Sequence, residues 1–201
     1  MPMIAGLFDE YCKAKLAVEL LEDAGIAPKD ISIISRTLDG RRIDEGENQT
    51  AADAITGSGV GAVAGAAGGL LAGMGVIAIP GIGPVLAAGW LITMLVGAAG
   101  GAVLGGATGG IIGALTGSGI SKDDADVYAE SLRRGGALVI ARVREAQVPL
   151  ANEILDRVPR IDIAARRAFY VQGGWKRFDE KRGLYDPPDR DPIHYAPPPR
   201  V

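Results

Sequence analysis

Apolar positions in residues 1–38 follow two different periods. Short apolar runs at residues 4–8 and 31–34 each predict a β-strand. Between them, apolar residues recur at the spacing of one helix face: Leu16, Leu20 and Leu21, with Val18 at its margin. Asp9 stands where an N-cap carboxylate accepts free amides of the first helical turn, and Gly25 stands where the helix would end. Residues 1–38 therefore predict strand, helix, strand.

Within residues 121–172 the same order of elements returns after one extra helix. Ser121, with Asp124 three residues later, resembles a capping box and predicts a helix that ends at Gly135. The elements expected next are a buried strand at 137–141, a helix at 149–158 and a last strand at 161–164. Strand, helix, strand, repeated twice, is the order of an α+β ferredoxin-like sandwich. Its two halves would be residues 1–38 and 121–172.

A long segment without charge separates these two halves. No charged side chain occurs between Asp53 and Lys122, although a helix of a soluble domain normally presents a polar face to solvent. The run is divided by four residues that predict the turn of a hydrophobic helical hairpin: Pro80, Gly81, Gly83 and Pro84. The hairpin would occupy residues 55–120. Its arms, residues 55–79 and 84–118, would be about 36 and about 50 Å long as helices, and a bilayer's hydrocarbon core is about 30 Å thick.

Glycine recurs at every fourth position in both arms. The first series is Gly57, Gly61, Gly65, Gly69 and Gly73, and the second is Gly97, Gly101, Gly105, Gly109, Gly113 and Gly117. Four residues are little more than one helical turn, so each series forms a ridge without side chains. Glycine costs about 1 kcal/mol relative to alanine in a helix, or roughly 10 kcal/mol for both series, and close backbone contact between helices can offset this. The series therefore predict a glycine zipper through which copies of the chain form a homo-oligomer.

Two other interpretations of the glycines stay open. The tract can be a low-complexity Gly/Ala sequence without defined contacts. Alternatively, Gly57, Gly59 and Gly61 crowd together as in a nucleotide-binding loop. The dinucleotide fingerprint, however, needs a preceding strand and an acidic residue about 20 positions later, whereas the next acidic residue here is Asp123.

The absence of charge predicts that the hairpin inserts in a lipid bilayer, with Trp90 toward an interface. Basic residues precede it at Arg41 and Arg42 and follow it at Arg133 and Arg134. Because positive charge marks the cytoplasmic side, we expect a protein of the cytoplasmic membrane with both termini in the cytoplasm. The alternative is a soluble cytoplasmic oligomer that buries the hairpin in its core.

Two further segments flank the predicted domains. Residues 39–54 are polar without a period and predict an exposed linker, and residues 173–201, rich in proline and charge, predict a disordered or extended tail. Aromatic residues are spaced among the charges of the tail: Trp175, Phe178, Tyr185 and Tyr195. This spacing is typical of a segment that binds a protein partner or a membrane surface. The alternative is a solvated tail with incidental aromatic residues.

Composition and single residues favour a protein without catalysis. A net charge of −3 and a pI near 5.2 give no electrostatic footprint for nucleic acid. His194, the only histidine, lies among prolines, where neither a zinc site nor an acid–base pair can be built. Cys12 is the only cysteine, and Asp123, Asp124 and Asp126 are interpreted as carboxylates at a helix start. We expect no enzyme, no cofactor and no metal.

Four phrases of the sequence resemble the bacterial general-stress-protein domain, a YflT-like, heat-induced family. They are residues 6–9, the strand at 30–34, the Pro-Gly-Ile-Gly-Pro phrase within 79–89, and Arg133-Arg134-Gly135-Gly136 before a Leu-Val strand. The resemblance covers about residues 3–145, and the tail after Gly173 is not part of the pattern. It implies a stress-associated bacterial protein without defined catalytic residues.

These observations predict a non-enzymatic, stress-associated structural protein that assembles through glycine-zipper helices in or on a membrane. The alternative is a cytoplasmic module that binds a ligand or partner, with a hairpin that serves only for anchoring or oligomerisation. A pore is a weaker hypothesis, since no ionisable residue of the hairpin marks a path.

Overall fold

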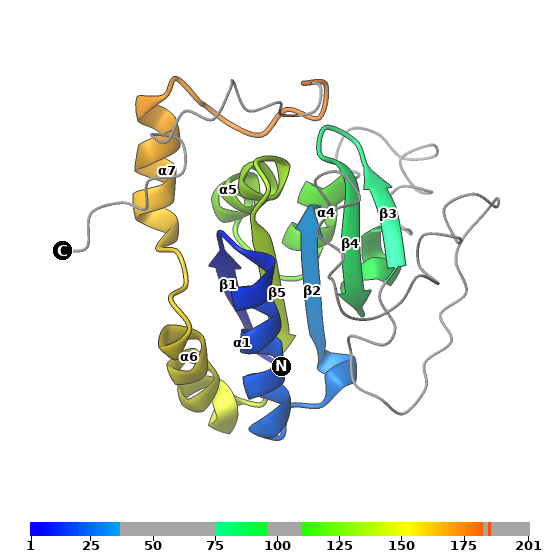
Figure 1. Cartoon of the computed structure of the whole chain (residues 1–201), viewed down its shortest axis with the longest axis vertical. Helices are drawn as coiled ribbons and strands as arrows, with labels where there is room; N and C mark the ends of the chain where they lie inside the picture. Colours follow the sequence, from blue (N-terminus) through cyan, green and yellow to red (C-terminus); the bar gives the residue numbers. More distant parts are fainter. Residues whose placement is uncertain (37–74, 96–109, 183–184, 186–201) are drawn as a thin grey trace.

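The computed structural model of the chain describes residues 1–36, 75–95, 110–182 and 185. These residues form a mixed fold of helices and one antiparallel five-stranded sheet, with strand order β1-β5-β2-β4-β3 (Figure 1). The strands are β1 (Met3–Phe8), β2 (Ile31–Arg36), β3 (Gly75–Ile79), β4 (Gly83–Gly89) and β5 (Ala137–Arg142). The helices are α1 (Tyr11–Asp23), α4 (Gly110–Gly117), α5 (Lys122–Arg133), α6 (Val148–Arg157) and α7 (Ile163–Gln172), with 3-10 turns η1 (Pro28–Asp30) and η3 (Glu145–Gln147).

The interior strand β5 shows how the sheet is buried on both faces. It pairs with β1 on one side and with β2 on the other. Ala137, Val139 and Ala141 pack toward α1 and α6, whereas Leu138 and Ile140 pack toward α4 and α5. A strand covered on both faces reads as a continuous apolar run, so the strands predicted at 4–8, 31–34 and 137–141 are confirmed.

The first face of the sheet is covered by α1 and α6. The buried side of α1 consists of Ala14, Ala17, Val18 and Leu21. The predicted helix face is therefore partly wrong: Val18 is central, and Leu16 is 47% exposed. Small alanines let α1 lie close to the sheet. The sequence prediction followed the leucines and therefore missed Ala14 and Ala17 as contact residues.

The ends of the helices confirm most of the predicted caps. Gly25 adopts φ +81° after α1, and Gly135 adopts φ +100° after α5. The Ser121 hydroxyl accepts a hydrogen bond from the Asp124 amide at 3.1 Å. The predicted N-cap at Asp9 is wrong, because Glu10 holds that position without a side-chain cap bond.

The predicted helical hairpin needs a correction at its turn. Residues 75–79 and 83–89 are strands, not the ends of two helices, and β4 pairs with β2 from Ser32↔Gly89 to Arg36↔Val85. β-Branched residues favour strands, and the free side of β2 offers hydrogen bonds to a neighbour. The second arm is helical at residues 91–95 and in α4.

The last predicted strand, residues 161–164, is also wrong. The Asp162 carboxylate accepts a hydrogen bond from the Ala165 amide at 2.7 Å and so begins α7. A single backbone bond, from the Ile161 amide to the Leu7 carbonyl at 2.8 Å, joins this segment to β1. Among the described residues, no helix is both long enough and apolar enough to cross a membrane.

Candidate functional site

The predicted hairpin turn lies at one end of the sheet, between β3 and β4. Pro80 and Gly81 lie in the turn, and Gly83 and Pro84 begin β4. Gly81 and Gly83 adopt φ values of +76° and +94°, which favour glycine. The Ile82 amide donates to the Ile79 carbonyl at 3.1 Å and closes the turn. Two of the four predicted residues thus lie in a turn and the other two begin a strand, so the turn joins strands and not helices.

Two of the eleven zipper glycines lie in α4. This helix buries Ile111, Ala114 and Leu115 against the sheet and α5, whereas Gly113 is half-buried and Gly117 is exposed. The other nine fall outside the described residues: Gly57, Gly61, Gly65, Gly69, Gly73, Gly97, Gly101, Gly105 and Gly109. The predicted linker, residues 39–54, falls outside them as well.

Residues 174–182, together with Tyr185, form a C-terminal strap that packs on the fold. Trp175 is 5% exposed and meets the edge of the Tyr170 ring, with centroids 5.6 Å apart. Phe178 is 6% exposed and belongs to the core on the α4 and α5 side of the sheet. The expectation of a tail without its own packing is therefore wrong for these residues, whose two large aromatic rings bury apolar area.

The strap lies directly over the turn and over the start of α4. A Cβ atom placed on Gly81 would lie 2.8 Å from the Cα of Glu180. A Cβ placed on Gly110 would overlap Oε1 of the same glutamate. Glycine at both positions lets the strap approach the backbone. The strap therefore contacts the turn and the start of α4, the helix that contains Gly113 and Gly117 of the second glycine series.

Burial shifts the pKa values of two carboxyls at the strap, those of Asp126 and Glu180. It raises the pKa of the Asp126 carboxyl, although the Phe178 amide donates to Asp126 Oδ1 at 3.3 Å and Lys122 and Arg177 act in the opposite direction. Burial, and then the charge of Asp179, raise the pKa of Glu180. Both carboxyls therefore hold a proton more readily in the folded chain.

The far end of the strap lies on a cluster of arginines at the end of α5. Glu130, 1% exposed, accepts from Nε and Nη2 of Arg133 at 2.9 and 2.7 Å and from Nε of Arg134 at 2.7 Å. Both guanidinium groups stand over the Tyr185 ring, 5.3 and 5.1 Å from its centroid. Arg36 Nη1 donates to the Tyr185 carbonyl at 2.9 Å. Paired charges and cation–π contacts thus hold the strap at this end.

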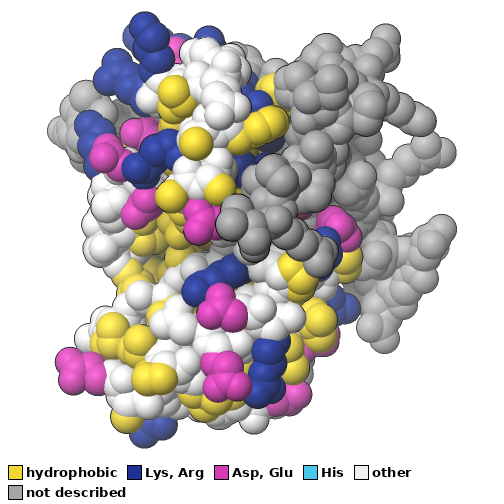
Figure 2. Space-filling view, turned by 90° about the vertical axis from the view of Figure 1, so that its left-hand side faces the viewer, with side chains coloured by type: hydrophobic (Ala, Val, Ile, Leu, Met, Phe, Trp, Pro, Cys, Tyr) yellow, Lys and Arg dark blue, Asp and Glu magenta, His cyan; other side chains and the backbone are white. Residues whose placement is uncertain are grey.

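Other charged side chains form ion pairs on and between the helices. Figure 2 shows basic side chains interspersed with acidic ones over the face that carries α6 and α7, where Arg157 pairs with Glu153 and Arg160 with Asp156. Asp124 pairs with Arg167 at 2.8 Å. Within the described ranges, no group of three or more His, Cys, Asp and Glu side chains could hold a metal ion. His194 lies outside these ranges, and Cys12 is exposed.

No protein-family model matches the chain, and searches of curated proteins and of solved structures gave no match either. The resemblance to the general-stress-protein domain therefore stays a prediction from the four phrases quoted above.

Sequence reasoning missed the intramolecular role of the strap. Trp175 and Phe178 were visible as aromatic residues in a charged segment, and that pattern does not distinguish a partner's surface from the chain's own. The sequence carried no signal for this contact, because the proximity of Gly81 and Gly110 to Glu180 follows only from the fold.

Proposed function

We propose that the chain is a non-enzymatic, stress-associated structural protein that assembles into a homo-oligomer through its two glycine series. The observation that carries the proposal is the orientation of α4. Ile111, Ala114 and Leu115 face the core, and Gly113 and Gly117 lie on the opposite side of the helix. These two glycines, the part of the second series that the structure describes, thus point away from the chain's own sheet, as a contact surface between copies requires.

The energetic argument supports the same proposal. Each glycine in a helix interior costs about 1 kcal/mol relative to alanine. Four-residue periodicity places these costs on one ridge instead of spreading them around the helix. Backbones that approach closely along such a ridge gain van der Waals contact and weak Cα–H···O bonds. Contact between copies is the compensation that the pattern implies.

The topology constrains how a membrane would take part in this assembly. The strands before and after residues 37–74 are β2 and β3, and both belong to the same sheet. A segment that enters a bilayer between these points has to leave it on the side of entry. We therefore propose association with the cytoplasmic face of a membrane, with both termini in the cytoplasm; a soluble cytoplasmic oligomer is the alternative.

We further propose that the core is a ferredoxin-like sandwich with an inserted β-hairpin. The order β1-α1-β2-β5-α6, with β5 between β1 and β2 and both helices on one face, is what supports this. β3 and β4 extend the sheet beyond β2. The place of the last strand, beside β1, holds only the bond from Ile161 to Leu7 in the described part of the chain.

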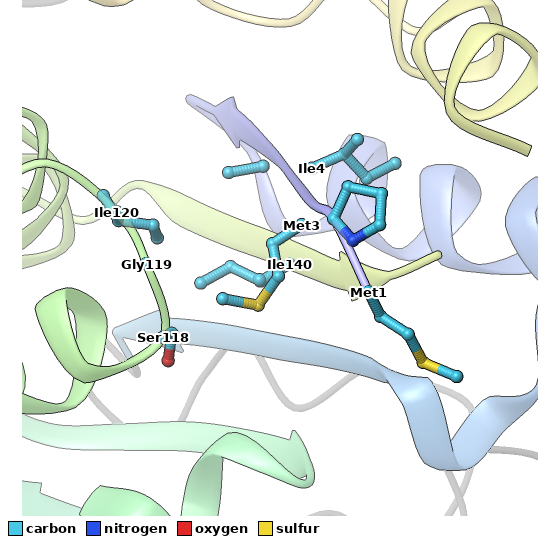
Figure 3. Close-up of a pocket in the computed structure, with 9 residues that line it drawn as sticks. Met1, Met3, Ile4, Ser118, Gly119, Ile120 and Ile140 are labelled. Carbon is cyan, nitrogen blue, oxygen red and sulfur yellow. The ribbon is translucent and has the colours of Figure 1, made fainter. Parts of the chain in front are cut away.

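A second candidate function is a partner-binding module whose glycine segments only anchor it or join copies. It is favoured by the outer edge of β1, which pairs with no further strand among the described residues and lies beside a cavity lined by Met3, Ala5 and Ile140 (Figure 3).

Leucine at Gly65 and Gly105 tests the assembly, because each substitution places a side chain on the ridge. The native mass, measured by light scattering during size-exclusion chromatography, should fall to that of smaller species in Gly65→Leu and Gly105→Leu. The alanine variants should show a smaller fall. Ala67→Leu and Ala107→Leu, two residues further along a helix and so on the opposite side, are the matched controls. An unchanged mass in the ridge variants would contradict the proposal.

A further inference from the structure

The C-terminal strap is attached to the fold at its two ends and at one residue between them. Near its start, the Trp175 amide donates to the Tyr170 carbonyl at 3.0 Å. At its end, the Tyr185 ring lies under two guanidinium groups of α5. Between these points, Phe178 inserts into the core. Figure 1 shows the strap in orange, running from the end of α7 toward the turn between β3 and β4.

The strap is built to detach without disrupting the sheet. It contributes no strand to the five-stranded sheet, and within residues 174–182 only Trp175 and Phe178 are buried. It joins α7 at Gly174, which adopts φ +81°, and a Cβ there would meet nothing within 4 Å in the described residues. Segments with few buried apolar side chains open at a lower free energy than the core of a fold. The strap can therefore leave while the sheet stays folded.

Glu180 is the strap residue that reaches α4. A Cβ on Gly110, the first residue of α4, would overlap its carboxylate oxygen and lie 3.2 Å from its carboxyl carbon. The backbone of Glu180 lies against Gly81 in the turn. Neither residues 79–83 of the turn nor α4 contains an ionisable residue. The contact is therefore steric, without an ion pair to the surface that the glutamate covers.

The residue that Glu180 covers lies on the side of α4 that carries the second glycine series. Gly110, Gly113 and Gly117 stand at positions i, i+3 and i+7 of the helix, which share one side. At about 1.5 Å per residue, Gly110 lies about 4.5 Å along the axis from Gly113, and a helix with its side chains is about 10–12 Å wide. A partner helix centred on Gly113 would therefore extend to Gly110 and meet the Glu180 side chain.

We propose that the strap is an autoinhibitory element that covers one end of the glycine side of α4 and leaves it when a second copy of the chain binds there. The inference rests on the proposed assembly through the second glycine series and adds the regulation of that assembly. The strap and the second copy compete for the space beside Gly110, so each binds at the expense of the other. The fraction of chains with a detached strap then limits assembly.

Glu180→Ala tests this competition, because it removes the side chain beside Gly110 and leaves both aromatic anchors of the strap in place. The concentration at which half of the full-length chains are assembled, measured by sedimentation, should fall at least fivefold. Glu19→Ala, at an exposed position of α1, makes the same change of charge and should stay within twofold of the wild type.

Two further variants make the test independent of one substitution. Gly81→Ala displaces the strap at the turn and should favour assembly as Glu180→Ala does, whereas Gly25→Ala, with a similar backbone angle, should not. Adding Gly117→Leu to Glu180→Ala places a side chain on the glycine side of α4 and should abolish the gain.

Hydrogen exchange in the wild-type chain provides a second measurement. Peptides from residues 174–182 should exchange faster at concentrations where copies are assembled than where they are separate, because the strap has left α4. A segment that becomes buried between copies would exchange more slowly on assembly. Slower exchange would make the strap a part of the interface and overturn the proposal.

The variants also separate this proposal from the proposed function. If Glu180→Ala and Gly81→Ala assemble as the wild type does while Gly65→Leu and Gly105→Leu still lower the mass, autoinhibition is wrong and assembly through the glycine series stands. A gain that persists with Gly117→Leu would place the restraint at another surface and would overturn autoinhibition as well. If Gly65→Leu and Gly105→Leu leave the mass unchanged, but Gly117→Leu abolishes the gain of Glu180→Ala, the strap restrains contacts of α4 and the wider assembly proposal is wrong.

Discussion

Arg166 donates through Nη2 to both carboxylate oxygens of Asp9, at 2.8 and 3.0 Å, although 157 residues separate them. Arg166 is 8% exposed, and its guanidinium also lies 5.9 Å from the centroid of the Tyr170 ring. Asp9 follows the last residue of β1. The pair therefore attaches α7 to the end of an edge strand.

Removing the Asp9 charge should destabilise the fold measurably. Asp9→Asn leaves the buried Arg166 without its ionic partner, and the Asp9 side chain is 34% exposed. Exposed pairs contribute about 0–1 kcal/mol, and breaking a buried pair costs about 3–5 kcal/mol. We expect a loss of about 1–2 kcal/mol in the free energy of unfolding, measured by urea denaturation.

The matched control for this pair is Glu153→Gln in α6. Glu153 pairs with Arg157 at 2.7 Å, but the side chains are 60% and 65% exposed. Its removal should change the free energy of unfolding by less than about 0.5 kcal/mol. Equal losses in the two variants would show that the contact between Asp9 and Arg166 does not stabilise α7.

Local pattern explains why much of the α+β core was predictable. Residues 4–8, 31–34 and 137–141 are apolar runs of strand length, and Gly25 ends a helix by its own backbone freedom. Asp9 shows where local reasoning fails. Its position before a helix suggests a cap, but Arg166, far along the chain, donates hydrogen bonds to its carboxylate. A rule based on neighbouring residues cannot predict a partner so distant in sequence.

The uncharged segment was harder to interpret for a different reason. Its residues 75–89 contain only Gly, Ala, Val, Ile, Leu and Pro, so without polar positions the pattern does not distinguish a strand from a helix. β3 and β4 formed because β2 had a free side to pair with. The proline–glycine phrase located the turn correctly, but it does not specify which elements the turn joins.

The two carboxyls at the strap should destabilise the fold when they are ionised, at neutral pH, and should not do so when they are protonated, in acid. Burial raises the pKa values of Asp126 and Glu180 above their ordinary values. A raised folded-state pKa stabilises the fold below the unfolded-state pKa of about 4, and this contribution is lost as pH rises through the folded-state value. Asp126→Asn and Glu180→Gln, which carry no charge at any pH, should match the wild type near pH 3 and exceed its stability at pH 7.

Thermal unfolding at these two pH values checks that expectation. Glu19→Gln, at an exposed position of α1, is the control and should show no such difference between acid and neutral pH. If Asp126→Asn and Glu180→Gln are less stable than the wild type at pH 7, their carboxylates stabilise the strap in ionised form and the assignment is wrong.

Gly81 and Gly25 have similar backbone angles, so substituting each one distinguishes the effect of backbone strain from the effect of a contact with the strap. Gly81 and Gly25 adopt φ +76° and +81°, so alanine at either position costs about 1 kcal/mol in strain. A Cβ on Gly25 meets nothing within 4 Å in the described residues, whereas one on Gly81 meets the Glu180 backbone. Gly81→Ala should therefore displace the strap as well.

Hydrogen exchange measured on peptides from residues 174–182 distinguishes these effects. Exchange there should rise in Gly81→Ala and stay at the wild-type rate in Gly25→Ala. Equal exchange in both variants would mean that the strap is not held against the turn.

A cysteine scan of residues 57–73, in a Cys12→Ser background, tests most directly whether the glycine ridge joins copies of the chain. Disulfides form only where Cα atoms of two copies come within about 7 Å. The yield of covalent dimer after mild oxidation should peak at positions 57, 61, 65, 69 and 73 and fall between them. A yield that is negligible throughout, or that shows no four-residue period, would contradict assembly through the glycine ridge.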